Sequence, residues 1–165
     1  MFRVHGERAV KDLIAILPGA STVTGFVSSS DIGKLVVASS NNAVLALGTT
    51  ADTNVFLGIV ASVPTATTPA STVPFYIEPI IPGQLYEADF STTYSTVLPA
   101  TTDLGRYVGM PNTTTVAGGS YLDMDKLGAV GTTSGNFFKI GLPPSTSMVD
   151  RRVVVGTFNS SHIGI

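Results

Sequence analysis

The sequence predicts an all-β protein, an antiparallel β-barrel or β-sandwich with a short N-terminal amphipathic helix. The chain of 165 residues contains 19 Val and 21 Thr, which favour strands, and 17 Gly and 10 Pro, which favour turns. Ten short apolar runs follow one another, with turn-forming residues between them. This spacing is typical of antiparallel barrels and sandwiches.

The N-terminal segment differs from the rest because its apolar residues recur with the period of a helix. The apolar stripe, at positions i, i+3, i+4 and i+7, consists of Val10, Leu13, Ile14 and Leu17. We therefore expect a helix over residues 7–17 in an arm of residues 1–20, followed by a β domain over 21–165. A helix this short is not stable alone in water. The stripe is thus expected to bind a partner chain, a second copy, or the β domain itself.

The candidate strands follow the arm and alternate with turn signals. They cover residues 22–27, 34–38, 43–47, 55–61, 73–80, 84–90, 106–109, 121–125, 137–142 and 152–158. Two further segments, 64–74 and 92–103, are poor in charge and rich in Thr, Ala, Ser and Pro. We expect both to be exposed loops, which either contact another chain or serve only as connections.

Charge is scarce and unevenly placed. Charged residues make up 12% of the chain, and Asp52 is the only one between Leu35 and Tyr76. A solvated surface usually carries about 25–35% charge, so either a neighbouring chain covers part of this surface or Ser and Thr solvate it. The net charge of −2 argues against nucleic-acid binding. No apolar stretch approaches the about 20 residues of a membrane helix, so a membrane partner is not expected either.

Motifs of catalysis and cofactor binding are missing from the sequence. There is no phosphate loop, no nucleophile elbow, no dinucleotide fingerprint and no Cys. The two histidines, His5 and His162, lie near opposite ends of the chain, and a zinc site would need further ligands. We therefore expect a protein that is not an enzyme and that binds no cofactor or metal.

Two acidic pairs are the strongest remaining candidates for chemistry. Asp123 and Asp125 are two residues apart in one expected strand, as are Glu87 and Asp89 in another. Residues two apart share a face of a strand, where two carboxylates are able to bind Ca²⁺ or act as an acid and a base. The simpler interpretation is that both pairs lie on the solvent face of half-buried strands.

The order of several segments resembles a known family. These segments are Gly33-Lys34-Leu35-Val36, Leu57-Gly58-Ile59-Val60, Pro82-Gly83-Gln84-Leu85-Tyr86-Glu87-Ala88, Phe138-Lys139-Ile140 and Val155-Gly156-Thr157-Phe158-Asn159. Together they resemble the small β-barrel capsid decoration (cement) proteins of tailed bacteriophages, over roughly residues 22–160. The resemblance implies a homotrimer on the outer surface of the capsid, where it binds the major capsid protein.

Three functions follow from these observations. The first is a structural virion protein that stabilises the lattice of the major capsid protein. The second is a receptor- or glycan-binding β-sandwich module of a phage head or tail fibre. The third is a glycosidase that uses carboxylates alone, which requires acidic residues clustered in a cleft.

Overall fold

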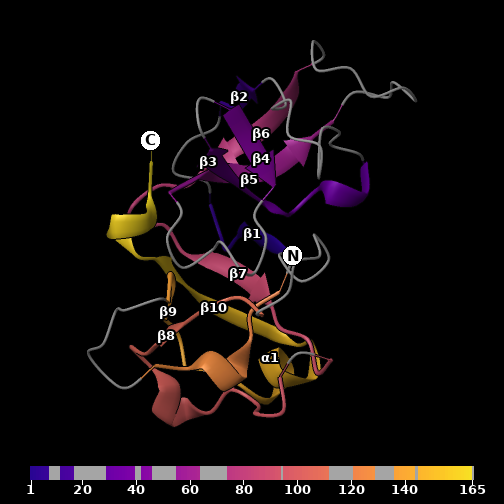
Figure 1. Ribbon diagram of the computed structural model, residues 1–165. Coiled ribbons are helices and arrows are strands. Elements are labelled where there is room, and N and C mark those ends of the chain that lie inside the picture. Colours follow the sequence, from indigo (N-terminus) through magenta and orange to yellow (C-terminus); the bar gives the residue numbers. More distant parts are fainter. Residues whose placement is uncertain are drawn as a thin grey trace.

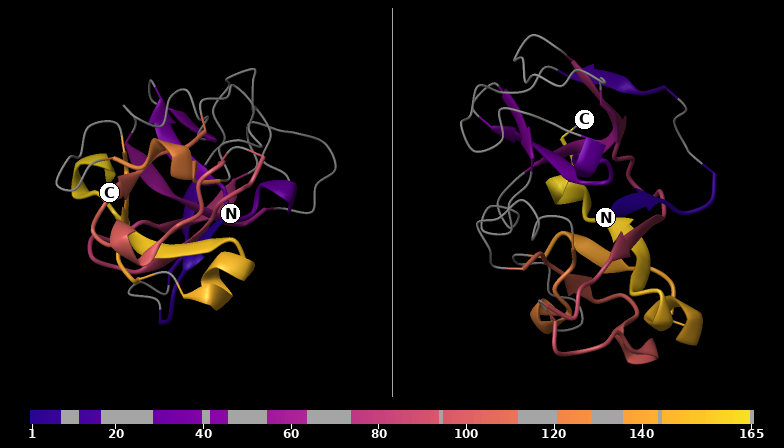
Figure 2. Two further views of the ribbon diagram at one scale, coloured as in Figure 1. Left: turned by 90° about the horizontal axis from the view of Figure 1, so that it is seen from below. Right: turned by 90° about the vertical axis from the view of Figure 1, so that its right-hand side faces the viewer.

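The structure is a computed structural model that describes residues 1–7, 12–16, 29–39, 42–45, 55–63, 74–93, 95–111, 121–128, 136–143 and 145–164. The strands in these residues form two antiparallel sheets of five strands each. Figure 1 shows one sheet above the other, and Figure 2 gives the same arrangement from two further sides. The protein is therefore an all-β sandwich.

Sheet A, the lower sheet in Figure 1, has the strand order β1-β7-β10-β9-β8. Its strands are β1 (Phe2–Val4), β7 (Tyr86–Asp89), β8 (Tyr107–Val108), β9 (Phe138–Ile140) and β10 (Val153–Phe158). The central strand β10 pairs with β7 on one side and with β9 on the other. Gly156 makes the second pairing possible, because a Cβ atom at this position would collide with the carbonyl oxygen of Lys139.

Sheet B, the upper sheet, has the order β2-β6-β5-β3-β4. Its strands are β2 (Ile14–Ile16), β3 (Leu35–Ser39), β4 (Asn42–Leu45), β5 (Phe56–Ser62) and β6 (Phe75–Pro79). The pairing of β5 with β6 shifts register between Val60 and Ser62, which is typical of a β-bulge. Most of the charge-poor stretch between Leu35 and Tyr76 that the structure describes lies in this sheet.

The main core fills the space between the two sheets. Alternate residues of strands from both sheets point into it, including Leu35 and Val37 of β3 and Tyr86 and Ala88 of β7. Aromatic rings form its centre, from Phe2, Phe56, Phe137, Phe138 and Phe158, with neighbouring ring centroids 4.8–6.2 Å apart. The buried Tyr86 hydroxyl accepts a hydrogen bond from the Ile81 backbone N–H at 2.9 Å. Burial of so much aromatic surface is the main source of stability in such a fold.

A second, smaller core lies on the other face of sheet B. It consists of Val36, Val60, Phe75 and Ile77, none of which is more than 1% exposed. Ile16, Leu57 and Val63 are partly buried against it. Sheet B is therefore apolar on both faces, which explains why strands β3, β5 and β6 carry so few charges.

Helical structure is limited to single turns. The described residues contain one α-helical turn, α1 (Thr146–Asp150), which the sequence did not predict. Its N-cap is Ser145, whose hydroxyl accepts a hydrogen bond from the Met148 N–H at 3.3 Å. The 3-10 turns are η1 (Ser29–Asp31), η2 (Thr101–Asp103), η4 (Met124–Lys126) and η5 (Ser160–His162).

The predicted N-terminal helix is wrong where the structure describes the segment. Ile14–Ile16 forms strand β2 and pairs with Phe75–Ile77 of β6, while residues 8–11 and 17 lie outside the described residues. A helix of two or three turns has little stability of its own, whereas two β-branched isoleucines separated by one residue suit a strand. As a strand, Ile14–Ile16 finds partners for its backbone N–H and C=O groups on the edge of β6. An isolated helix would have to satisfy these groups within its own few turns.

Most of the other strand predictions are confirmed, and the exceptions are few. Strands β3 to β10 each overlap an expected run, and the run 22–27 lies outside the described residues. The run 121–125 is not a strand but two isolated bridges followed by the turn η4, and β1 was not predicted. The sheets also do not close into a barrel, because β1, β8, β2 and β4 are edge strands among the described residues.

Candidate interaction surfaces

The structure places two of the four predicted contact residues at the edge of sheet B. Leu13 precedes β2 and Ile14 begins it, and each is 38% exposed. Val10 and Leu17 lie outside the described residues. Ile14 lies opposite Ile77, so it extends the apolar outer face of sheet B to the edge of the sheet. The two residues thus remain candidates for contact, on a strand rather than on a helix.

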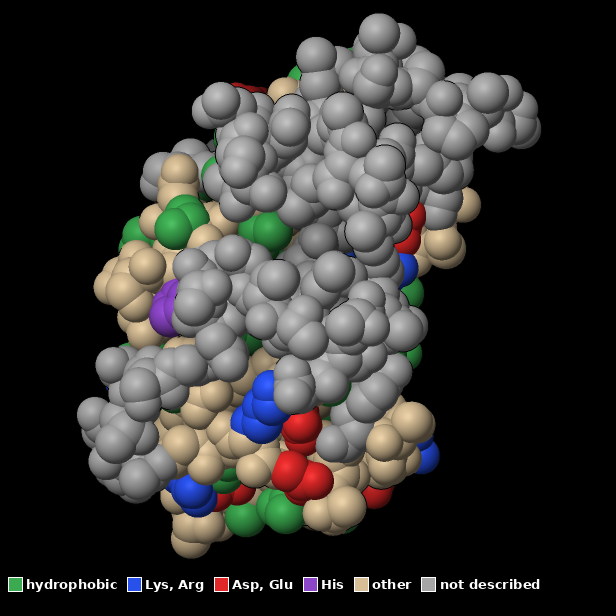
Figure 3. Space-filling model, in the orientation of Figure 1, with side chains coloured by type: hydrophobic (Ala, Val, Ile, Leu, Met, Phe, Trp, Pro, Cys, Tyr) green, Lys and Arg blue, Asp and Glu red, His purple; other side chains and the backbone are tan. Residues whose placement is uncertain are grey.

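A second group of exposed apolar side chains lies in the segment between β7 and β8. Val97, Leu98 and Leu104 are 49%, 52% and 48% exposed. We call residues 95–104 the apolar loop. In Figure 3 apolar side chains lie beside acidic and basic ones in the lower part of the molecule, where Figure 1 draws η2 and η4. The segment 92–103 was predicted to be a contact loop, but the sequence did not single out these three side chains.

Asp125 fixes the first half of the apolar loop. Its carboxylate accepts hydrogen bonds from the backbone N–H groups of Thr96 and Val97, at 2.9 and 2.8 Å, and from the Thr96 hydroxyl at 3.0 Å. These bonds from Thr96 and Val97 hold the pKa of Asp125 below its ordinary value. The buried Ser95 hydroxyl accepts a further bond from the Met124 N–H at 2.9 Å. The backbone around Val97 is thus tied to η4.

Asp103 fixes the second half of the apolar loop. Its carboxylate, 4% exposed, accepts a hydrogen bond from the Ala100 N–H at 2.8 Å and pairs with Arg106 at 2.9 Å. The Arg106 guanidinium also donates to the Gly128 carbonyl at 2.8 Å. Leu98 and Leu104 therefore extend from a backbone that is anchored on both sides before any partner arrives.

The first acidic pair has a structural role that differs from both sequence interpretations. Asp123 is 8% exposed and caps η4 by accepting a bond from the Asp125 N–H at 3.0 Å, while Asp125 anchors the apolar loop. Burial raises the pKa of Asp123 above its ordinary value despite that bond. Among the described residues, no three His or carboxylate side chains are grouped so that they could hold a metal ion.

The second acidic pair belongs to an ion-pair network on the outer face of sheet A. Glu87 pairs with Arg3 at 2.7 Å and contacts His5 Nδ1 at 3.0 Å, and Asp89 pairs with Arg3 at 2.9 Å. Burial acts to raise the pKa of Glu87, but the bonds from His5 and Arg3 outweigh it, and the pKa lies below its ordinary value. Solvent-face placement was predicted for this pair, and the structure adds its partners, Arg3 of β1 and His5 directly after that strand.

The histidines have different surroundings in the structure. His5, the residue after β1, contacts Glu87 of β7. His162, in η5, stacks on Phe56 with ring centroids 6.3 Å apart. His162 Nδ1 also lies 3.1 Å from the hydroxyl of its neighbour Ser161. The structure thus pairs one histidine with an acid and the other with a hydroxyl, at two separate places.

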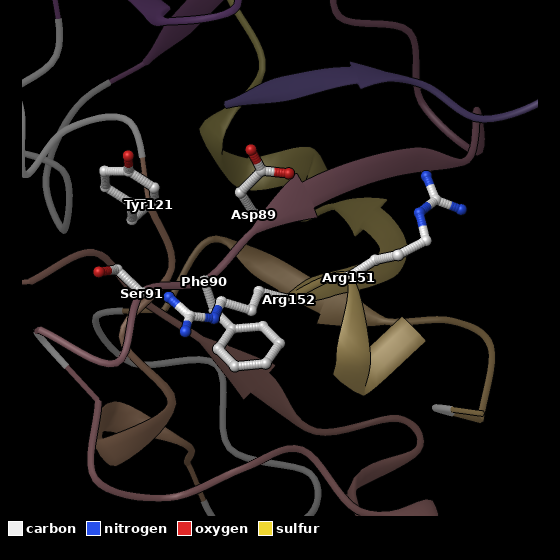
Figure 4. Close-up of a pocket in the computed structure, with 6 residues that line it drawn as sticks. All are labelled: Asp89, Phe90, Ser91, Tyr121, Arg151 and Arg152. Carbon is white, nitrogen blue, oxygen red and sulfur yellow. The ribbon is translucent and has the colours of Figure 1, made fainter. Parts of the chain in front are cut away.

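A polar pocket of about 250 Å³ opens where β7 ends and β10 begins. It is lined by Asp89, Phe90, Ser91, Tyr121, Arg151 and Arg152 (Figure 4). No sequence motif singled out the two arginines. The available signal was their adjacency in a chain with only nine Lys and Arg.

Comparisons with known proteins give no relative. No protein-family model, no curated protein and no solved structure matches the chain. In the part of the chain that the structure describes, no helix has both the length and the apolar character to cross a membrane.

Proposed function

We propose that this chain is a structural virion protein that binds the major capsid protein on the outer surface of a tailed-phage head and stabilises the capsid lattice. The observation that carries the proposal is the apolar loop, which displays Val97, Leu98 and Leu104 from a backbone anchored by Asp125 and Asp103. Exposed apolar side chains grouped on a rigid support are typical of protein contact sites.

The anchoring matters because association costs conformational entropy. A loop that is already ordered loses less freedom on binding, so more of the burial energy remains as affinity. Full burial of a Val or Leu side chain contributes about 1.5–3 kcal/mol. Two or three such side chains per copy are sufficient for a weak contact, which becomes strong when several copies bind one lattice.

The resemblance to cement proteins supports the choice of a capsid as partner and of a homotrimer as the bound form. In this proposal the edge of sheet B, with Leu13 and Ile14, supplies a second contact, either between copies or with the capsid. No catalysis is assigned to the chain. In support, the carboxylates of Glu87, Asp103 and Asp125 are occupied by ion pairs or loop hydrogen bonds.

Cosedimentation with capsids tests the proposal. Purified chain is mixed with heads assembled from the major capsid protein of the phage that carries its gene, and the bound fraction is measured. We expect saturable binding for the natural chain and a loss of about tenfold or more in affinity for the double variant Leu98→Ser/Leu104→Ser, because side chains at the centre of a contact cost more than about 1 kcal/mol each when truncated.

A matched control separates the contact from general hydrophobicity. Ile32 is 40% exposed, but it follows η1 and belongs neither to the apolar loop nor to β2. The variant Ile32→Ser is therefore expected to bind capsids like the natural chain. A double variant Leu13→Ser/Ile14→Ser tests the edge of sheet B. Point variants are preferable to deletion of residues 1–17, since deletion removes β1 and β2 from the two sheets. Absence of binding by the natural chain contradicts the proposal.

Self-association is tested separately by analytical ultracentrifugation. We expect a trimer, either free in solution or when bound to capsids. A strict monomer in both settings contradicts the homotrimer and leaves the capsid contact to the cosedimentation result.

A further inference from the structure

The polar pocket has an arginine in a backbone conformation that side chains rarely adopt. Arg152 has a φ of +56°, the only positive value for a non-glycine residue in the described part of the chain. It follows the helical turn α1 and its C-cap Arg151, at the position where helices usually place glycine. Its N–H donates to the Val149 carbonyl at 3.0 Å, and its carbonyl accepts from the Phe90 N–H at 2.9 Å. Glycine would satisfy the same backbone bonds without the strain.

The side chain of Arg152 does not repay this strain through an ion pair with the described residues. Arg151 lies 3.7 Å from Glu87, and Asp89 pairs with Arg3, but no described carboxylate lies within ion-pair distance of Arg152. Figure 4 shows Arg151 extending away from the pocket while Arg152 extends toward Ser91. Residues held in strained conformations cluster at functional sites, and this one brings to a pocket a positive charge that has no ion-pair partner among the described residues.

The other lining residues indicate what the charge would meet. Ser91 offers a hydroxyl and Tyr121 an aromatic ring (Figure 4). Asp89 adds a carboxylate acceptor, whose two oxygens also pair with Arg3 at 2.9 Å and with the N-terminal ammonium at 3.3 Å. The lining is mostly polar, and the volume of about 250 Å³ is smaller than the pockets of about 300–1,000 Å³ that take drug-sized ligands. A guanidinium binds carboxylates well because its planar fork matches their geometry, while the acceptor and hydroxyl suit neighbouring hydroxyl groups.

We propose that this pocket binds an acidic monosaccharide, with Arg152 as the partner of the sugar carboxylate and Asp89 and Ser91 as partners of its hydroxyl groups. This role goes beyond the capsid contact, which uses the apolar loop. It would give a capsid-surface protein an affinity for acidic glycans.

The test is a titration of the full chain with sodium glucuronate, followed by NMR of the backbone amides of Ser91 and Arg152. Two matched probes accompany it: the methyl ester of glucuronate, which lacks the charge, and acetate, which lacks the sugar. We expect saturable shifts with glucuronate and binding about tenfold or more weaker for both probes, since loss of a charged hydrogen bond has this effect. Absence of saturation with glucuronate overturns the proposal, and acetate binding as tightly as glucuronate overturns the sugar assignment.

Variants assign the binding to Arg152. Arg152→Gly is expected to lose about tenfold or more in glucuronate affinity while its melting temperature stays equal or rises, because glycine adopts a positive φ without strain. Lys139→Gln, which removes one charge from the exposed face of β9, is expected to bind like the natural chain. Unchanged binding by Arg152→Gly, a lower melting temperature for it, or an equal loss in Lys139→Gln each contradicts the assignment.

The capsid contact and the sugar pocket are tested by different results, so one proposal can be contradicted while the other stands. Arg152→Gly is expected to cosediment with capsids like the natural chain, since it leaves the apolar loop intact. If it loses capsid binding as strongly as it loses glucuronate, the pocket is part of the capsid contact and its assignment to a sugar is wrong.

Discussion

The two sheets share one core but differ in what their outer faces carry. The outer face of sheet A holds Arg3, Glu87, Asp89 and Lys139, and the first three form ion pairs. The outer face of sheet B holds the second core, whose apolar residues from β3, β5 and β6 are almost fully buried. A sheet with one solvated face accepts charge readily, whereas a sheet buried on both faces accepts little. The described strands of sheet B carry a single charged residue, Glu78 of β6, which is 7% exposed.

This difference changes the meaning of the low charge content. The scarcity of charge between Leu35 and Tyr76 suggested either a surface covered by another chain or one solvated by Ser and Thr. In sheet B much of it follows instead from burial within a single chain. The best contact candidate lies instead beside sheet A, where Asp103 and Asp125 are used to hold the apolar loop. In sheet B the scarcity of charge therefore accompanies a second core, whereas beside sheet A two carboxylates hold the apolar loop in place.

The largest expected change in stability comes from a pair of variants that test whether the second core is as well packed as the first. Ile77 in sheet B and Ile140 in sheet A are both fully buried, in different cores. Ile77→Ala and Ile140→Ala are each expected to lower the free energy of unfolding by about 2–5 kcal/mol, measured by urea denaturation. A cost below about 1 kcal/mol for Ile77→Ala, with a normal cost for Ile140→Ala, would mean that the outer face of sheet B is not a core.

The next largest change in stability is expected from variants that test the close approach of strands within each sheet. A Cβ atom at Gly58 of sheet B would lie 2.5 Å from the Glu78 carbonyl oxygen, and one at Gly156 of sheet A would meet the Lys139 carbonyl. Each glycine-to-alanine variant is expected to lose about 1–3 kcal/mol through overpacking. The neighbouring Thr157→Ala serves as the control in thermal denaturation, and an equal loss in the control contradicts the steric explanation.

A smaller effect distinguishes the outer faces by their response to pH. Glu87→Gln is expected to cost about 1 kcal/mol at neutral pH, because it weakens a partly buried network of charged hydrogen bonds. The folded pKa of Glu87 is depressed, so its stabilisation is fully present above the ordinary value of 4.5 and is lost as the pH falls through the folded pKa. The difference between the two proteins should therefore narrow below pH 4.5. The cost of Ile77→Ala should not change over the same range, and parallel pH curves for both variants would contradict the comparison.

The smallest effect is local. Asp125→Ala removes the acceptor of the Thr96 and Val97 N–H groups from an exposed position. We expect faster hydrogen exchange at these two amides and little change in the melting temperature. Asp150→Ala, on α1 of the same half of the molecule, is the control and should leave both amides unchanged. Unchanged exchange in Asp125→Ala would show that the apolar loop does not depend on this carboxylate.

The all-β class and most strands could be predicted because turn residues and β-branched runs act locally. The period-2 burial of Tyr86 and Ala88 against Glu87 and Asp89 in β7 is readable in the sequence. The N-terminal helix failed for a non-local reason: Ile14 and Ile16 also fit a strand, and the deciding factor was the free edge of β6, about 60 residues away in the chain.

The candidate site was only partly accessible to sequence reasoning. A loop over 92–103 could be expected, but its rigidity depends on Asp125, which is 28 residues from Val97. The pocket depends on the positive φ of Arg152, and no residue type signals this conformation when it is not glycine or asparagine. Contacts between distant segments, rather than local propensity, determine both features.

A reconstruction by electron cryo-microscopy of the phage head, with this chain added, tests the central claim most directly. The account predicts density for the sandwich on the outer surface of the capsid, with three copies around a symmetry axis and with Leu98 and Leu104 packed against the major capsid protein. Heads that carry no such density at saturating chain, or density in which the apolar loop faces solvent, would contradict it.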